Sequence, residues 1–227
     1  NYDTTGAKTI FLVTTDIDKG RMLWEPFSMH RAGIYEVERN LYKNISGTAI
    51  IFEEVNHDLG LTYRYAWRTS EAFGFVKTSY LINNQGQSCQ VDLLDGLQNV
   101  LPAHIQTDVQ NEFSNLLDAY KFSELHLPTG LGMYSLSSRL TDLAEPSESL
   151  RTNVVWQAGL EDETYLLSST QLDAFRSGAG VHQEEYIRGK RGAYFVQATL
   201  VLDAKAEHHW HQVADVEQDS SQAVALV

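Results

Sequence analysis

The sequence predicts a mainly β protein in which two antiparallel layers pack as a super-sandwich. Segments rich in β-branched, aromatic and aliphatic residues follow one another along most of the chain, separated by Gly, Pro, Asn and Asp. In the stretch 61–68, large apolar residues alternate with Thr, Arg and Ala, which puts the aromatics on one face and both arginines on the other. Helices do not alternate with these segments, so a parallel sheet is excluded and two packed antiparallel sheets are favoured.

The first strands are expected at 9–15 and 21–25, joined by a hairpin turn at 16–20 where Asp and Gly suit a turn. The segment 34–42 alternates like a strand, although its charged residues would also suit a helix surface, and the flanking Gly33 and Asn44 favour the strand. The remaining strands are expected at 48–56, 61–70, 73–83, 88–94, 131–140, 150–158, 164–168, 192–203 and 207–216.

One or two short helices interrupt this pattern. Apolar residues recur at helical intervals over 103–121, with a break near 112–115. A helical turn is expected over 170–176, where Thr170 suits the N-cap and Gly178 the end.

Composition restricts the partners. The 227 residues, of which 43% are hydrophobic and 11% aromatic, suffice for one large β domain. A net charge of −13 repels phosphate backbones and anionic lipids, and no apolar stretch is long enough to span a bilayer, so neither nucleic acid nor membrane is an expected partner. Cys89 is the single cysteine, which excludes an internal disulfide and favours a cytoplasmic location.

Four stretches carry a resemblance to a known family: RNLYKN from Arg39, FEEVNHDLGLTYRYAW from Phe52, SEAFGFVKTSYLIN from Ser70 and LDGLQNVLP from Leu94. They resemble the amino-terminal domain of cellobiose-phosphorylase-like enzymes (glycoside hydrolase family 94 and its relatives), and WHQVADV from Trp210 is similar to the end of that domain. The resemblance implies a galactose-mutarotase-like β super-sandwich, followed by a helical linker and an (α/α) barrel that carries the catalytic acid and the phosphate site.

The same resemblance implies how the chain is organised. Residues 1–216 would form the super-sandwich, and 217–227 would begin a linker toward a catalytic barrel outside this sequence. The chain would then be a non-catalytic domain without a cofactor that supports the barrel, its sugar site or a homodimer contact. Two alternatives stay open: a stand-alone aldose-epimerase-like enzyme, and a carbohydrate-binding module.

Candidate sugar-binding residues lie in the central strands. Glu53 and Glu54 are adjacent on one strand and point to opposite faces, so they cannot form the facing pair of a glycosidase. Carboxylate, amide and guanidinium groups do form bidentate hydrogen bonds to sugar hydroxyls. The predicted sugar-binding residues are Glu54, Asn56, Arg64 and Arg68. The competing interpretation is one solvated glutamate and one in a salt bridge to Arg64 or Arg68.

Other chemically suggestive residues have simpler interpretations. The four tryptophans lie in expected strands and favour core packing over a sugar platform. The histidines at 208, 209 and 211 lack an evident third metal ligand on one face, so no metal site is expected. An epimerase-like acid and base would have to come from His57, His104, Asp95 and Glu185, which no spacing selects. Asp95 and Gly96 are expected to form a turn.

Overall fold

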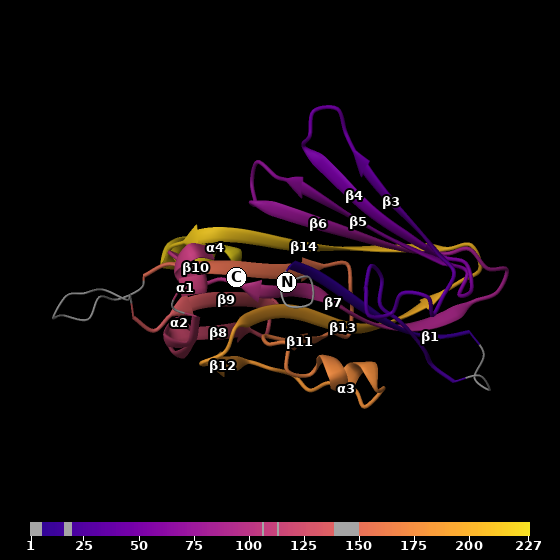
Figure 1. Cartoon of the computed structure of the whole chain (residues 1–227). Helices are drawn as coiled ribbons and strands as arrows, with labels where there is room; N and C mark the ends of the chain where they lie inside the picture. The colour runs from indigo at the N-terminus through magenta and orange to yellow at the C-terminus, as the bar shows by residue number, and fades with distance from the viewer. Residues whose placement is uncertain (1–5, 16–19, 106, 113, 139–149) are drawn as a thin grey trace.

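The computed structural model describes residues 6–15, 20–105, 107–112, 114–138 and 150–227. The protein is mainly β and consists of two antiparallel sheets, as predicted (Figure 1). The five-stranded sheet has the order β11 (Thr164–Leu166), β13 (Gly192–Leu202), β7 (Cys89–Val100), β1 (Gly6–Thr14), β2 (Met22–Trp24). The nine-stranded sheet has the order β12 (Tyr186–Arg188), β8 (Lys121–His126), β9 (Leu131–Leu136), β10 (Thr152–Ala158), β14 (Glu207–Gln218), β6 (Phe75–Asn83), β5 (Leu61–Thr69), β4 (Ala49–Asn56), β3 (Val37–Lys43).

The main core lies between the two sheets. On β1, Phe11 and Val13 point into it, while Ile10 and Leu12 point to the opposite face. That outer face is also buried, because the short helix α3 (Leu172–Arg176) packs Leu172 and Phe175 against it. The central strands of the five-stranded sheet are therefore covered on both faces, which agrees with the unbroken apolar runs at residues 10–13 of β1 and 193–196 of β13.

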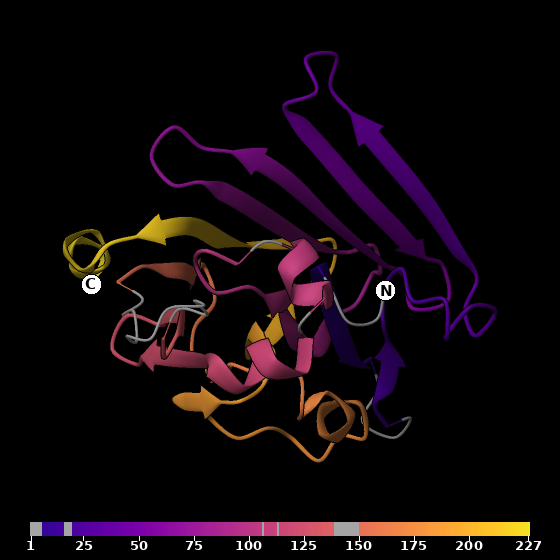
Figure 2. The ribbon, with the colours of Figure 1, turned by 60° about the vertical axis from the view of Figure 1, so that its left-hand side comes forward.

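Strands β3 to β6, here called the wing, diverge from the five-stranded sheet (Figures 1 and 2). On the inner face of the wing, the rings of Phe52 and Tyr65 stack with centroids 4.9 Å apart. Farther out, Leu41 and Phe75 are 62% and 51% exposed. The five-stranded sheet thus covers only part of the wing, which leaves an apolar sheet face partly open.

The helices agree with the prediction in part. The expected helix over 103–121 is present as the helical segments α1 (Thr107–Glu112) and α2 (Ser114–Tyr120), and the break predicted near 112–115 includes residue 113, which lies outside the described residues. For α3, Gly178 ends the helix at φ +76°, but the N-cap is Gln171 rather than Thr170. A further helix, α4 (Ser220–Leu226), occupies the segment expected as a linker and begins with a capping box between Asp219 and Gln222.

Three further differences concern strands and turns. The strands β8 and β12 were not predicted, because each is short and carries charged residues. The predicted turn at Asp95 and Gly96 is wrong, since both residues lie in the middle of β7. Strand β14 continues to Gln218, past the expected domain boundary at 216. The predicted turn residues 16–19 and strand residues 139–140 lie outside the described residues.

Within the described part of the chain, none of the helices has the length and apolar character needed to cross a bilayer.

Candidate functional site

A pocket of about 880 Å³, lined mainly by residues of polar and charged types, opens on the outer side of the five-stranded sheet. Three separate parts of the chain form it: the segment that follows β2, the ends of β1 and β7 with the segment before β13, and the region around α3. Its lining residues that carry the argument below are Lys8, Glu25, Ser28, Gln98, Asn99 and Arg176.

Glu25 is the anionic centre of the pocket wall. Its carboxylate is 5% exposed and forms ion pairs with Lys8 and Arg176, the latter through two hydrogen bonds of 3.0 and 3.1 Å. Burial raises the pKa of Glu25, but the hydrogen bonds from Arg176 and Lys8 outweigh it and hold the pKa below its usual value. A carboxylate bound in this way is a weak base, so its role is to position the two cations.

Three buried polar atoms at the pocket have no protein partner: Ser28 Oγ, Gln98 Nε2 and Asn99 Oδ1. Ser28 and Gln98 are 2% and 4% exposed. Buried polar atoms are almost always paired, because an unpaired one costs about 1–3 kcal/mol. Two further unpaired atoms, Asn56 Nδ2 and Gln212 Oε1, lie away from the pocket, but three gather at this one cavity, which makes its wall the candidate surface for a polar ligand.

A β-bulge turns both amides toward the pocket. Gln98 pairs with Ala193 and Val100 with Gly192, so Asn99 is left without a partner on β13. Asn99 has φ +52°, in the left-handed region that asparagine tolerates better than most residues. Adjacent residues of a regular strand point to opposite faces, and a bulge changes that direction. This is why neighbouring side chains line one cavity.

The four predicted sugar-binding residues do not meet at one site. Glu54 and Asn56 point inward: Glu54 accepts hydrogen bonds from Trp24 Nε1, Phe27 N and Arg39 Nε at 2.7–2.8 Å, and Asn56 is fully buried. Arg64 and Arg68 lie on the opposite face of β5 from the inward Tyr63. A shared sugar-binding role for these four would need both faces of one sheet.

Neither adjacent glutamate is solvated. Glu53 is 5% exposed and binds the guanidinium of Arg64, with Nε 2.8 Å from Oε2, and it also accepts from Asn40 and Tyr42. The predicted salt bridge to Arg64 is therefore present on Glu53. The expectation of a solvated partner fails, because Glu54 is 2% exposed and is saturated by three donors.

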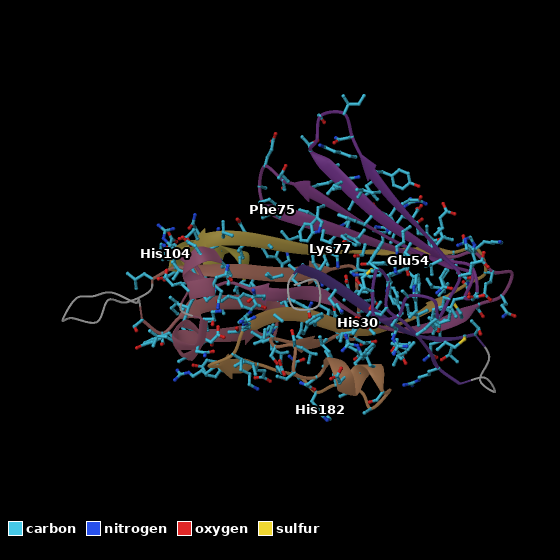
Figure 3. All side chains as sticks on the ribbon, viewed as in Figure 1. His30, Glu54, Phe75, Lys77, His104 and His182 are labelled. Atoms are coloured by element: carbon cyan, nitrogen blue, oxygen red, sulfur yellow. The ribbon has the colours of Figure 1, made fainter. Side chains whose placement is uncertain are left out.

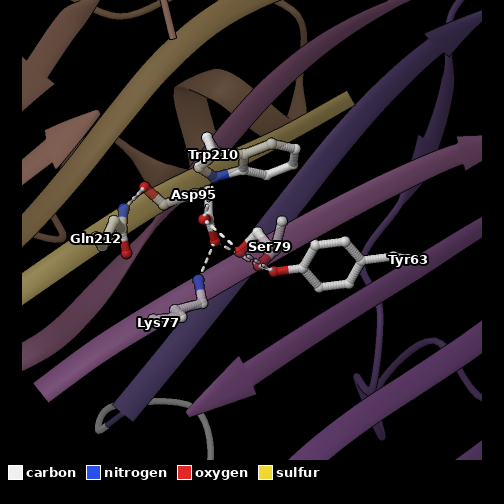
Figure 4. A network of polar contacts seen from close by, with 7 residues as sticks. Tyr63, Lys77, Ser79, Asp95, Trp210 and Gln212 are labelled. Atoms are coloured by element: carbon white, nitrogen blue, oxygen red, sulfur yellow. Dashed lines mark hydrogen bonds and ion pairs between the residues drawn. The ribbon is translucent and has the colours of Figure 1, made fainter. Parts of the chain in front are cut away.

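Asp95 is the centre of a buried polar network between the sheets (Figure 4). Lys77 Nζ lies 2.5 Å from Oδ1, and both side chains are 0% exposed. Trp210 Nε1 donates to Oδ2 at 2.7 Å. Thr9 and Ser79 also donate to the carboxylate, and Tyr63 connects these two hydroxyls. Every oxygen is occupied and no described pocket reaches the network, so it acts in folding.

Within the described residues, the histidines do not form a cluster that could act as a metal or acid–base centre. His30, His104 and His182 lie at separate places in the molecule (Figure 3). The rings of His209 and His211 are 5.6 Å apart, but no group of three metal-ligating side chains occurs among the described residues. The candidate acid–base residues His57 and Glu185 are exposed on separate loops, and Asp95 is sealed in the core.

The four tryptophans, which were predicted to pack in the core, differ in how deeply they are buried. Trp24 and Trp210 are 1% and 0% exposed, whereas Trp67 and Trp156 are half-buried. Trp67 packs against the main core, and Trp156 contacts Phe73 edge to face. None of the four lines the described pocket, so they do not form a sugar-stacking platform there.

Sequence reasoning missed the residues that form the pocket. Ser28, Gln98 and Asn99 are of common polar types and lie more than sixty positions apart across the two segments. One signal was available: an asparagine that follows a long apolar strand and precedes Val100 and Leu101, where alternation is interrupted.

No protein-family model matches the chain, and no curated protein matches it. Among solved structures it is similar to a crystal structure of heparinase III, with TM-score 0.42 and 13% identity over 81% of this chain and 22% of that one. A polysaccharide lyase gives TM-score 0.47 and 10% identity over 98% of this chain and 27% of that one. The chain thus spans about a quarter of the length of these structures. Neither is a cellobiose-phosphorylase-like enzyme, so that resemblance stays a prediction.

Proposed function

We propose that this chain is a saccharide-binding β domain of a longer carbohydrate-processing enzyme and that it carries no bond-breaking groups of its own. The resemblance of its central strands to cellobiose-phosphorylase-like enzymes supports the carbohydrate context. The single observation that carries the proposal is the pocket with three unpartnered buried polar atoms.

Sugar hydroxyls suit such a pocket, because each hydroxyl both donates and accepts hydrogen bonds. Ser28 Oγ can take either role, Gln98 Nε2 donates and Asn99 Oδ1 accepts. A ring with hydroxyls on adjacent carbons presents both roles within one ligand. Binding would thus recover the hydrogen bonds that these three atoms lack in the free protein.

The buried carboxylates support a non-catalytic role. Glu25, Glu53, Glu54 and Asp95 each bind at least one cationic side chain. An acid or nucleophile of a glycosidase must face its substrate with a free oxygen. We further propose that the open apolar face of the wing contacts the catalytic barrel or a second copy of the domain.

Two variants test the saccharide site directly. Ser28→Ala and Asn99→Gly remove unpartnered groups, and Gly at position 99 keeps the positive φ without strain. Titration calorimetry with a panel of oligosaccharides should show binding to the unaltered chain and a loss of about 5- to 100-fold in each variant. Their free energies of unfolding should stay unchanged or rise, because no protein hydrogen bond is lost.

Ser79→Ala is the matched control, since the Ser79 hydroxyl hydrogen-bonds Asp95 and Tyr63. It should lose about 1 kcal/mol of stability and bind saccharide like the unaltered chain. A chain that binds no saccharide, or that binds equally well with and without Ser28 Oγ, would contradict the proposed site. Phosphorolysis, hydrolysis or mutarotation of sugars by this chain alone would contradict the non-catalytic role.

A further inference from the structure

We infer that the pocket selects an acidic saccharide, with Arg31 and Lys190 placed to bind an anionic group on the sugar. The inference rests on the proposed function and specifies its ligand class. It is carried by the charge of the pocket, by the ion pairs already formed in its wall and by the kinds of side chain that line it.

The charge of the pocket is opposite to that of the whole chain. The chain carries a net charge of −13. The pocket lining nevertheless contains five Lys or Arg side chains against two carboxylates, together with His30. Clefts lined by one sign of charge concentrate ligands of the other sign. The local excess of positive charge thus favours an anion.

The ion pairs in the pocket wall involve only some of the Lys and Arg side chains that line the pocket. Lys8 and Arg176 share Glu25, and Arg176 also binds Asp173 at 2.7 Å. Arg191 lies 3.5 Å from Asp118. Arg31 and Lys190 have no ion-pair partner among the described residues, although Arg31 is half-buried. A half-buried guanidinium without a carboxylate is the group that an anionic ligand would complete.

The lining also lacks the usual means of binding neutral sugars. No Phe, Tyr or Trp occurs among the described residues that line the pocket. Neutral sugars are commonly held by packing their apolar face on an aromatic ring. Here the available interactions are hydrogen bonds and charge, which suits a sugar that carries a carboxylate or a sulfate.

The test compares acids with their own esters. Oligomers of galacturonate, glucuronate and mannuronate are titrated calorimetrically into the 227-residue chain, each beside its methyl ester, which keeps the ring and removes the charge. At least one acid should bind about 10- to 100-fold more tightly than its ester, as expected for charge-assisted hydrogen bonds. Raising the salt from 50 to about 500 mM should reduce this difference by screening.

Three variants test which residues make the pocket prefer an acid over its methyl ester. Arg31→Gln and Lys190→Gln should each bring the affinity for the acid toward that of the ester and leave ester binding unchanged. Lys43→Gln removes one positive charge from an exposed position on β3 outside the pocket, so it should retain the selectivity. Inorganic phosphate serves as a competitor that carries charge without a sugar and should displace the acid only weakly.

The possible failures are distinguishable. Equal binding of acids and esters, still weakened by Ser28→Ala, would overturn the acidic ligand while keeping the saccharide site. Phosphate that binds as tightly as the acids would assign the cations to a free anion instead and would overturn the inference. If no oligosaccharide binds, either as the acid or as the ester, both the proposed saccharide-binding function and the inference of an acidic ligand are refuted.

Discussion

At the residue scale, Lys77 and Asp95 form an ion pair whose two side chains are both fully buried between the sheets. Burial lowers the pKa of Lys77, and the charge and hydrogen bond of Asp95 oppose that effect. A buried ion pair often contributes little net stability, but removing one partner leaves an uncompensated charge in the core. The pair thereby fixes which residues of β6 and β7 face each other across the two sheets.

Lys77→Met should lower the free energy of unfolding by about 3–5 kcal/mol, because the buried carboxyl group of Asp95 would lose its cationic partner. The double variant Lys77→Met with Asp95→Asn should recover part of this loss. Urea denaturation at neutral pH measures both. Lys43→Met, the same change at an exposed position on β3, should stay within about 0.5 kcal/mol of the unaltered chain. A Lys77→Met protein as stable as Lys43→Met would contradict this structural role of the Lys77–Asp95 pair.

Glu25 should make stability depend on pH in the acidic range. Its pKa in the folded protein lies below the usual glutamate value of 4.5, so its contribution to stability is complete above that value and is lost as pH falls through the folded pKa. Urea unfolding between about pH 5 and about pH 3 should show a steeper loss of stability in the unaltered chain than in Glu25→Gln. Parallel curves for the two proteins would show that Glu25 is not responsible.

At the element scale, β7 shows how a turn-like dipeptide can belong to a strand. Asp95 and Gly96 suit a turn by residue type, yet Asp95 is neutralised by Lys77 from another strand. Gly96 is needed for close approach: a Cβ there would lie 2.1 Å from Tyr194 O on the paired strand β13. Both reasons come from residues distant in sequence, so local turn preference predicted the wrong structure.

Gly96→Ala should therefore destabilise the protein by more than about 2 kcal/mol, because backbone rather than a flexible side chain must move. Gly86→Ala is the matched control: it lies in a loop, meets nothing within 4 Å and lacks a positive φ. The free energy of unfolding of Gly86→Ala should stay the same or rise by up to about 1 kcal/mol. Thermal and urea unfolding of both variants measure the contrast, and similar losses in both would refute the close-approach explanation.

At the scale of the whole molecule, the fold class was predictable because alternation within a strand is a local property. In the stretch 61–68, Tyr63 is buried and Arg68 is exposed as the sequence indicates, although Thr62 and Ala66, on the same face as Arg68, are buried as well. The pocket was not predictable in the same way. Ser28 follows β2, Asn99 ends β7 and Arg176 ends α3, and only the pairing of distant strands brings them together.

The split of the predicted sugar-binding residues has the same origin. The register of β4 with β5 puts Glu54 and Arg64 on opposite faces of their sheet, because Glu54 pairs with the inward Tyr63. What the sequence does not reveal is that the inner face is sealed at Glu54 by Trp24, Phe27 and Arg39. Local pattern thus determines which face a residue occupies, whereas the packing of distant segments determines whether that face remains open.

The ends of the sheets bear on how copies of the chain behave in solution. Strands β2, β11 and β12 each have three residues and form three of the four sheet borders. The fourth border is the seven-residue β3, which carries Glu38, Arg39 and Lys43. Short border strands, and charged side chains on the longer one, disfavour the addition of strands from another molecule. The described borders of both sheets therefore give a second copy little backbone on which to extend a fibril.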